Sequence, residues 1–228
     1  MSELLGKELK PSLVKSLLRR NGFRWKRMRN SLKSERDEVL FEFFKSELQA
    51  LKQLASEGQI DLYYLDETGL NLNPNVPYAW QKLNTTALLP AQRADAKTIV
   101  GMFSPIKQDL RAALFDGAVD ARCIRAFIDH FAEKLPEQTN RKTIVVLDQA
   151  TIHTAGIIKE RFNAWQKKGL YLQFLPAYCS ELNLIEILWK HLKHFWIKAE
   201  DYASIDTLTK AAKGILKQYG KHYTISFL

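Results

Sequence analysis

The spacing of apolar residues predicts two helices near the start of the chain. The first covers residues 12–20, where Ser12 is a suitable N-cap and Asn21-Gly22 a stop signal. The second covers about residues 36–55 and ends near Gly58. The apolar stripes consist of Leu13, Val14, Leu17 and Leu18 in the first helix and of Phe41, Phe44, Leu48, Leu51 and Leu54 in the second.

From residue 59 on, the pattern changes to strands and then to strands alternating with helices. Apolar and alternating runs predict strands at residues 61–66, 97–103, 110–115, 142–148 and 170–175. Helical spacing predicts helices at residues 121–135, 153–167, 182–197 and 205–219. The sequence therefore predicts a mixed α/β fold, with antiparallel strands first and β-α-β crossovers afterwards.

The composition is that of a globular protein, but the charge is unevenly distributed. Of the 228 residues, 46% are hydrophobic and 26% charged, and the formal net charge is +9. Residues 1–34 hold ten basic residues against two acidic ones, and residues 187–228 hold seven lysines against three acids. Basic terminal segments around a mildly acidic centre indicate a protein that binds a polyanion through its two ends and acts on it with its central part. Solvated lysine faces are an equally ordinary explanation for the C-terminal segment.

The sequence argues against several other classes of protein. No window of about 18 residues is apolar without a charge, which argues against a transmembrane helix. The first ten residues contain no apolar run of signal-peptide type. Cys123 and Cys179 lie far apart without a Cys-x-x-Cys pair, so neither a disulfide framework nor a structural zinc site is expected. We therefore expect a cytoplasmic protein without membrane contact.

Two aspartates stand at the ends of predicted strands, where a charge is costly unless the strand opens on a site. Asp66 shares one face of its strand with Leu62 and Tyr64 by alternation. Asp148 follows the β-branched run of residues 143–147, which is typical of a central buried strand. Ligands of open α/β sheets gather at the carboxyl ends of the strands, so both residues are candidates for a functional site.

A third acid, Glu186, falls on the apolar side of a predicted helix. The apolar stripe of that helix consists of Leu182, Ile185, Trp189, Leu192 and Trp196. At 100° per residue, Glu186 lies about 40° from Leu182 around the axis, so its carboxylate is expected to point towards the core side. Three carboxylates brought together repel one another, and oxygen ligands favour Mg²⁺ or Mn²⁺. Two such ions about 3.5–4 Å apart can cleave a phosphodiester.

Each of these residues also has an ordinary structural explanation. An aspartate at a strand end is often a turn former, and Glu186 has Lys190 four residues on as a possible ion-pair partner. Glu67 alternates to the face opposite Asp66 and is expected to be solvated. His153 is a possible ligand or base, but an imidazole near a helix start is more often structural or phosphate-facing. The tryptophans Trp80, Trp165, Trp189 and Trp196 are expected in the core.

The basic segment near the N-terminus is a candidate DNA-binding element. After residue 22 it interleaves aromatic and basic residues in the run FRWKRMR, which is typical of an arm that contacts phosphates. The candidate DNA-binding residues are Lys15, Arg19, Arg20, Arg24, Lys26, Arg27 and Arg29.

Three sequence blocks resemble the signature blocks of DDE transposases, and most closely those of the bacterial insertion-sequence branch of the mariner superfamily. They are residues 65–69 (LDETG), 146–153 (VLDQATIH) and 175–189 (LPAYCSELNLIEILW). The resemblance runs from about Lys10 to the end of the chain, and its third block is highly specific.

The resemblance implies a ribonuclease-H-like fold with Asp66, Asp148 and Glu186 as a metal-binding catalytic triad. It implies two Mg²⁺ or Mn²⁺ ions as cofactors, with His153 and Asn183 as supporting residues. Family members bind the terminal inverted repeats of their element, cut the DNA there and join the freed 3′-hydroxyls to target DNA. The implied partner is therefore double-stranded DNA, and a homodimer is expected because two element ends are handled together. The implied location is the nucleoid, in the cytoplasm of a prokaryote.

The resemblance also sets out a domain organisation. Residues 1–34 are expected to be a basic remnant of a helix-turn-helix DNA-binding domain, residues 35–58 a linker helix, and residues 59–228 a ribonuclease-H-like catalytic domain with a mixed sheet flanked by helices. Members of this branch carry a full pair of helix-turn-helix units, of which this chain resembles only the last part, with residues 12–20 as the recognition helix. Sequence-specific binding of element ends is therefore expected to be weak or absent in this chain alone.

Departures from the family pattern occur around two of the acids. Gln149 stands where asparagine is usual after the second aspartate. In the third block, Ala177, Ser180 and Leu184 stand where the family usually has prolines, which should loosen the loop that places Glu186.

Three functions are consistent with these observations. The first is a metal-dependent transposase that performs strand cleavage and strand transfer. The second is an N-terminally truncated, catalytically inactive remnant whose basic arm still binds DNA. The third is a different nuclease on the same fold, such as a junction resolvase, and the third sequence block argues against it.

Overall fold

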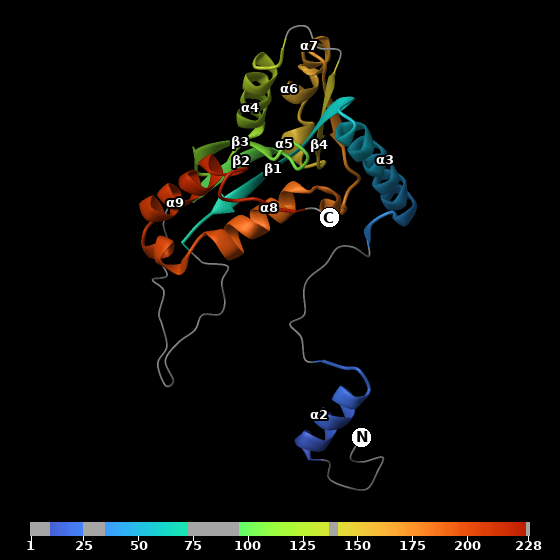
Figure 1. The fold of residues 1–228 in the computed structure, drawn as a ribbon, viewed down its shortest axis with the longest axis vertical. Helices are drawn as coiled ribbons and strands as arrows, with labels where there is room; N and C mark the ends of the chain where they lie inside the picture. Colours follow the sequence, from blue (N-terminus) through green and yellow to red (C-terminus); the bar gives the residue numbers. More distant parts are fainter. Residues whose placement is uncertain (1–9, 25–34, 73–95, 137–140, 227–228) are drawn as a thin grey trace. The chain divides into compact units, whose positions relative to one another are not determined.

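The chain forms two compact units, Met1–Ser34 and Glu35–Leu228. In the computed structural model, the described residues are 10–24, 35–72, 96–136 and 141–226. The described part of the first unit contains helix α2 (Pro11–Arg20), which is capped by Lys10 and Asn21 and has proline at its first position, so the expected N-cap Ser12 lies inside the helix. Leu13, Leu17 and Leu18 on this helix are exposed. The elements of the second unit are shown in Figure 1.

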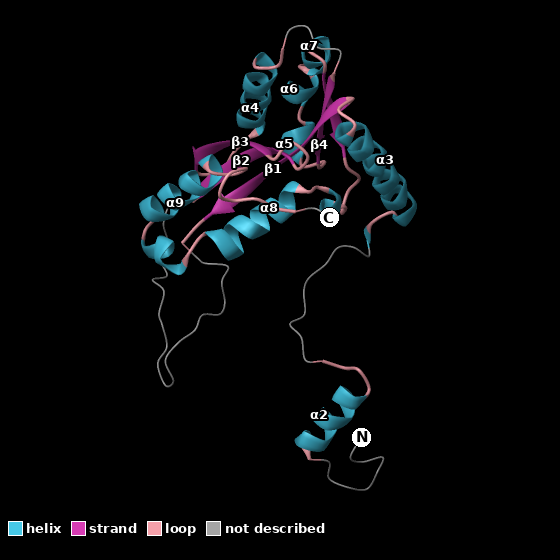
Figure 2. Cartoon of the chain, viewed as in Figure 1, coloured by secondary structure: helices cyan, strands magenta, loops and turns pink. Residues whose placement is uncertain are grey.

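The second unit is built on a five-stranded mixed sheet, which Figure 2 shows in magenta. The strand order is β3-β2-β1-β4-β5, antiparallel between β1, β2 and β3 and parallel between β1, β4 and β5. This confirms the predicted mixed α/β fold, with the antiparallel strands first in sequence. The strands are β1 (Ile60–Leu70), β2 (Lys97–Ser104), β3 (Asp109–Asp116), β4 (Lys142–Leu147) and β5 (Leu170–Phe174).

Helices cover both faces of the sheet, and alternation along the strands divides the core into two clusters. Leu62 and Tyr64 of β1 pack with α3 (Glu38–Ser56), α8 (Ile185–His191) and α9 (Ile205–Lys217). Tyr63 and Leu65 pack on the other face, with α4 (Ala121–Glu133) and the helices between β4 and β5. Successive side chains of a strand point to opposite faces, so each face of β1 needs its own helical layer. None of the helices in the described ranges is long and apolar enough to cross a bilayer.

Side-chain caps determine where several helices begin. The Asp37 carboxylate accepts from the amides of Val39 and Leu40 at 2.9 and 3.1 Å, so α3 starts at Glu38. Asp120 caps α4 in the same way, and Ser204 caps α9 through the amide of Thr207. The expected helix over residues 36–55 is thus confirmed, with its start moved to the residue after the cap.

β1 differs from its prediction because it continues past Asp66 to Leu70. β1 pairs with β4 only as far as Tyr64, but it pairs with β2 from Tyr64 to Leu70. The strand therefore keeps a hydrogen-bonded neighbour after the parallel ladder ends. Asp66 lies within the strand, so the prediction that it ends the strand is wrong.

Two predicted helices are interrupted. The helix expected over residues 153–167 is divided into α5 (Thr151–Thr154), α6 (Gly156–Lys159) and α7 (Phe162–Lys167). The break between α5 and α6 lies at Ala155, whose ψ is 150°. The helix expected over residues 182–197 begins as a 3₁₀ turn (Ser180–Leu182), continues as α8 and ends as a π-helix (Leu192–Trp196). A 3₁₀ turn (Ala199–Ala203) then leads into α9.

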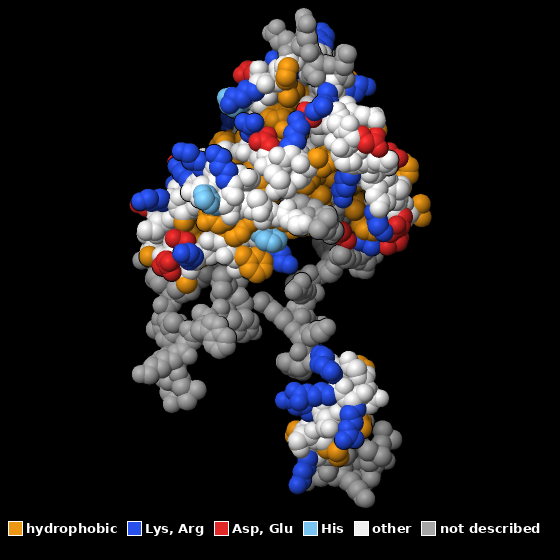
Figure 3. Space-filling model, in the orientation of Figure 1, with side chains coloured by type: hydrophobic (Ala, Val, Ile, Leu, Met, Phe, Trp, Pro, Cys, Tyr) orange, Lys and Arg blue, Asp and Glu red, His pale blue; other side chains and the backbone are white. Residues whose placement is uncertain are grey.

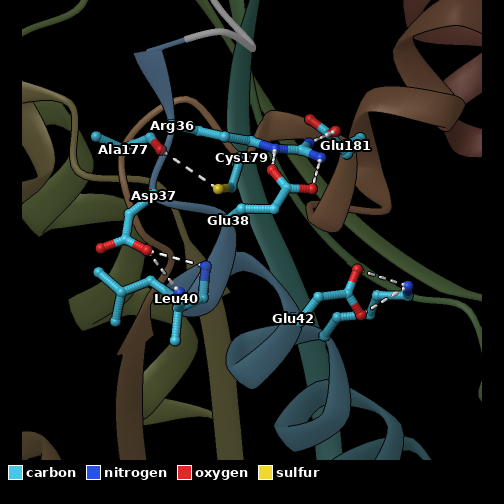
Figure 4. A network of polar contacts seen from close by, with 10 residues as sticks. Arg36, Asp37, Glu38, Leu40, Glu42, Ala177, Cys179 and Glu181 are labelled. Carbon is cyan, nitrogen blue, oxygen red and sulfur yellow. Dashed lines mark hydrogen bonds and ion pairs between the residues drawn. The ribbon is translucent and has the colours of Figure 1, made fainter.

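The loop before α8 is tied to the start of α3 by Arg36 (Figure 4). The Arg36 guanidinium donates to Glu38 at 2.6 and 2.7 Å and to Glu181 at 2.6 Å, and it lies 3.7 Å from the centre of the Phe41 ring. Cys179 of the same loop is buried. Leu184 has φ of −63°, close to the value that a proline would impose, so its backbone conformation is one that proline could also adopt.

Candidate active site

The parallel pairing of β1 and β4 brings two of the predicted site residues to one edge of the sheet. The register pairs Tyr64 with Val146. Asp66 and Asp148 each lie two residues further along their segment, Asp66 still within β1 and Asp148 directly after β4. Because the side-chain period of a strand is two, Asp66 faces the same side as Tyr64, towards α8.

Helix α8 carries Glu186 to this edge and is held against β1 by two side-chain hydrogen bonds. The Asn183 amide group donates to the backbone oxygen of Leu65 at 3.0 Å, and the Trp189 indole N–H donates to Oδ2 of Asp66 at 3.1 Å. Glu186 lies midway between these two residues in the sequence. Asn183 and Trp189 are buried, and their two bonds hold the loop in place although it lacks proline at positions 177, 180 and 184.

Glu186 differs in one respect from its prediction, because it is open to solvent. The buried side of α8 consists of Ile185, Leu188 and Trp189. The helix begins only at Ile185, so Glu186 lies in the first turn, beside the apolar stripe rather than on it. The expectation that the carboxylate points towards the core side is therefore wrong.

Burial and neighbouring acids raise the pKa of two of the three acids, Asp66 and Glu186. Burial raises the pKa of Asp66 to about 8, and the negative charges of Glu186, Glu67 and Asp148 add to this increase. Burial also raises the pKa of Glu186, together with the charges of Asp148 and Glu67, while Lys193 opposes the increase. The three environments differ, because Asp66 and Asp148 are half-buried whereas Glu186 is exposed.

Asp148 is stabilised in its charged form by His153. Nδ1 of His153 lies 2.6 Å from Oδ1 of Asp148, and the Ala150 amide donates to the same oxygen at 3.0 Å. These hydrogen bonds lower the pKa of Asp148 against the effect of its partial burial. His153, expected as a supporting residue, is completely buried and contacts this acid directly.

Glu67 belongs to the same cluster, which sequence reasoning missed. Its Oε2 lies 3.1 Å from Nε2 of His153, so the imidazole bridges two carboxylates. Burial disfavours the charged imidazole, but its hydrogen bonds to Asp148 and Glu67 outweigh this and raise the pKa of His153 to about 9. The expectation that Glu67 is solvated is wrong: it does alternate to the face opposite Asp66, where α5 places His153 against it.

Lys193 is a second residue that the sequence prediction missed. It is partly buried in the π-helix that follows α8 and interacts electrostatically with Glu186 and Asp66. Burial lowers the pKa of its ammonium group, and the two carboxylates oppose that decrease. Its position seven residues after Glu186 would place it on the same side of a regular helix, which is the signal that could have identified it.

The donor set of this cluster fits a divalent cation by its chemistry. Asp66, Asp148 and Glu186 offer oxygen ligands only, and a bound cation would offset both the burial and the repulsion that raise the pKa of Asp66 and Glu186. Within the ranges that the structure describes, however, no three acidic, histidine or cysteine side chains are arranged as ligands of one ion.

The candidate DNA-binding residues belong to the first unit, whose Lys and Arg side chains are visible in Figure 3. Lys15, Arg19 and Arg20 lie on α2 and are exposed, as is Arg24. The Arg24 guanidinium donates to the backbone oxygens of Arg19 and Phe23 at 3.0 and 2.9 Å. The other three candidates, Lys26, Arg27 and Arg29, and also Trp80, lie outside the described residues.

Comparison with known proteins gives a family match and several structural matches. A family model described as DDE superfamily endonuclease matches residues 61–209. The fold is similar to the crystal structure of the Mos1 strand transfer complex, with a TM-score of 0.61 and 16% sequence identity over 97% of this chain and 65% of that chain. It is also similar to the Mos1 mariner paired end complexes with Mn and with Mg, with TM-scores of 0.57 and 0.56, each at 16% identity over 97% of this chain and 74% of that chain.

At this level of identity, the structural likeness establishes the fold, a ribonuclease-H-like sheet flanked by helices, as predicted. The chain spans 65% of the length of the Mos1 chain in the strand transfer complex. No curated protein matches the chain. The matched residues 61–209 include the three acids of the site, which lie on β1, after β4 and on α8.

Proposed function

The chain belongs to the DDE superfamily of endonucleases, and from this premise we propose that it is a transposase. Its reaction would be metal-dependent cleavage of DNA at the ends of an insertion sequence, followed by joining of the freed 3′-hydroxyl ends to target DNA. The observation that carries the proposal is the raised pKa of Asp66 on β1 and of Glu186 on α8, to which burial contributes most and the charge of Asp148, directly after β4, adds. Perturbed carboxylates supplied by three separate elements are typical of a functional site.

We assign the role of metal ligands to Asp66, Asp148 and Glu186. When bound, a pair of Mg²⁺ or Mn²⁺ ions supplies an activated water or 3′-hydroxyl and stabilises the oxygen that leaves the scissile phosphate. Mos1 complexes with Mn and with Mg support this choice of ions. His153 would keep Asp148 ionised and fixed through Oδ1, and Glu67 would hold His153 from its other side. Lys193, beside Glu186, is suited to contact a DNA phosphate.

The proposed partner is double-stranded DNA, which includes the terminal inverted repeats of an element and the target. Residues 1–34 would supply a basic DNA-binding segment, residues 35–58 a linker helix and residues 59–228 the catalytic domain. A homodimer would allow two DNA ends to be processed together, and the paired-end complexes of Mos1 support this. A protein that acts on DNA in this way would work at the nucleoid of a prokaryotic cell.

Nicking of a supercoiled plasmid tests the proposed function. The full chain should convert supercoiled into open-circular DNA in the presence of Mn²⁺ or Mg²⁺, and EDTA should prevent the conversion. A parallel mobility-shift measurement shows whether the same preparation binds the plasmid. Binding without metal-dependent nicking would favour the alternative, a catalytically inactive DNA-binding protein.

The basic residues of the first unit should give DNA binding a steep salt dependence. Replacing Lys15, Arg19, Arg20 and Arg24 by glutamine should weaken binding and lower the slope of log K against log salt concentration by about 0.9 for each phosphate that is no longer neutralised. The measurement is fluorescence anisotropy of a labelled duplex between low and moderate salt. As the matched control, glutamine at the exposed Lys45 and Lys159 removes charge elsewhere on the chain. A slope unchanged by the four substitutions would contradict the assignment.

A further inference from the structure

Trp189 makes a contact with Asp66 that depends on the glycine across the sheet. The β1–β2 register places Asp66 directly opposite Gly101. The Trp189 ring lies against Gly101 so closely that a Cβ there would come within 2.5 Å of its Cη2 atom and 2.7 Å of its Cζ2 atom. With no side chain at position 101, the indole can lie over β2 and place its N–H 3.1 Å from Oδ2 of Asp66.

Packing alone does not explain why this residue is tryptophan. Its ring is buried with Ile185, Leu188 and Leu192, and phenylalanine would offer the same kind of apolar contact. The indole adds an N–H group, which needs an acceptor when it is buried. Here the acceptor is one oxygen of an acid that the proposed function makes a metal ligand. Hydrogen bonds to a ligating carboxylate commonly fix its orientation.

Asn183, two residues before α8 begins, gives the segment that leads into this helix a second hydrogen bond to the same strand. Its amide group donates to the backbone oxygen of Leu65, the residue before Asp66, at 3.0 Å. Asn183 and Trp189 lie three residues before and three residues after Glu186. The two bonds therefore fix how α8, and Glu186 with it, is aligned along β1 next to Asp66.

We propose that Trp189 is a positioning residue of the metal site. Its indole N–H would hold Oδ2 of Asp66 and so present the other carboxylate oxygen for metal binding, while the Gly101 contact and the Asn183 tie keep the indole and α8 in place. This inference rests on the proposed function, because it assumes that Asp66 is a metal ligand.

The test compares two tryptophans that make the same kind of bond. Trp165 is also buried, and its indole N–H donates to Oδ1 of Asp129 at 2.8 Å, in the core cluster on the other face of the sheet. Trp189→Phe and Trp165→Phe each remove one indole-to-carboxylate bond and keep an aromatic ring. The measurement is Mn²⁺ binding to the full-length variants by titration calorimetry, with thermal unfolding in EDTA to confirm that each is folded.

Trp189→Phe should lower the affinity for Mn²⁺ by about 10- to 100-fold, the usual effect of losing a hydrogen bond to a metal ligand. Trp165→Phe should leave the affinity within about twofold of wild type, because Asp129 lies outside the site. Unchanged Mn²⁺ affinity in folded Trp189→Phe would overturn the inference and leave the proposed function standing. If the wild-type chain itself binds no Mn²⁺, the proposed function fails.

A second substitution displaces the indole without removing it. Gly101→Ala should also weaken Mn²⁺ binding, because its methyl group would push the ring away from Asp66. In the Trp189→Phe background the same change should have little further effect, since the bond is already absent and phenylalanine lacks the two crowded atoms. Independent effects of the two substitutions would overturn the inference.

Discussion

Asp148→Ala should reduce metal-dependent nicking on the order of 10³-fold or more, equivalent to about 4 kcal/mol in the activation barrier. The substitution removes a proposed metal ligand and also the carboxylate that holds His153 from one side. Asp148 is only half-buried and follows the strand rather than forming part of it, so its loss creates no core cavity. The measurement is the initial rate of open-circle formation from supercoiled plasmid in Mn²⁺.

The matched control is Asp206→Asn, which removes a carboxylate from the exposed first turn of α9. It should nick DNA at the wild-type rate. Thermal unfolding of both variants shows whether either has lost its fold. Equal nicking by wild type and folded Asp148→Ala would mean that the activity does not come from this site.

Asp66→Asn should make the metal-free fold more stable while it removes activity. The pKa of Asp66 is about 8 in the folded chain, against an ordinary value near 4. At pH values between about 4 and 8, the Asp66 carboxyl group is ionised in the unfolded chain and protonated in the folded chain. The stability that Asp66 contributes is therefore complete below about pH 4 and is lost as the pH rises towards 8.

Asparagine avoids this loss because it carries no charge to desolvate. In EDTA at pH 7, the free energy of unfolding of Asp66→Asn should exceed that of wild type by about 4 kcal/mol, and the difference should vanish near pH 4. Urea unfolding at several pH values measures it. Asp61→Asn on the same strand is the control: Asp61 pairs with Lys107 and Arg141, so its loss should not stabilise the fold. A pH-independent difference for Asp66→Asn would contradict the environment described for Asp66.

The sequence was sufficient to place the three acids in their elements. A buried β-branched run predicts a central strand that ends at Asp148, one residue beyond the observed end of β4, and alternation places Asp66 on the same face as Tyr64. An apolar stripe predicts the helix that carries Glu186. These are local patterns, which place each acid separately. The prediction that the three acids share one site comes from the resemblance of the three sequence blocks to one family.

The contacts that organise the site depend on residues far apart in the chain. His153 reaches Glu67 across 86 positions and Trp189 reaches Asp66 across 123 positions, and no local period indicates either bond. The length of β1 was underestimated for a similar reason, because its last residues are strand only through their pairing with β2. The exposure of Glu186 follows from where α8 begins, which a stripe of apolar residues does not determine.

Titration of the full-length wild-type chain with Mn²⁺, by calorimetry near pH 7 in two buffers of different ionisation enthalpy, tests the shared metal site most directly. Asp66 is mostly protonated at this pH, so metal binding should release about one proton, and Asp66→Asn, Asp148→Ala and Glu186→Gln should each weaken binding strongly. Binding that releases no proton and is unaffected by these three substitutions would show that the acids do not share an ion.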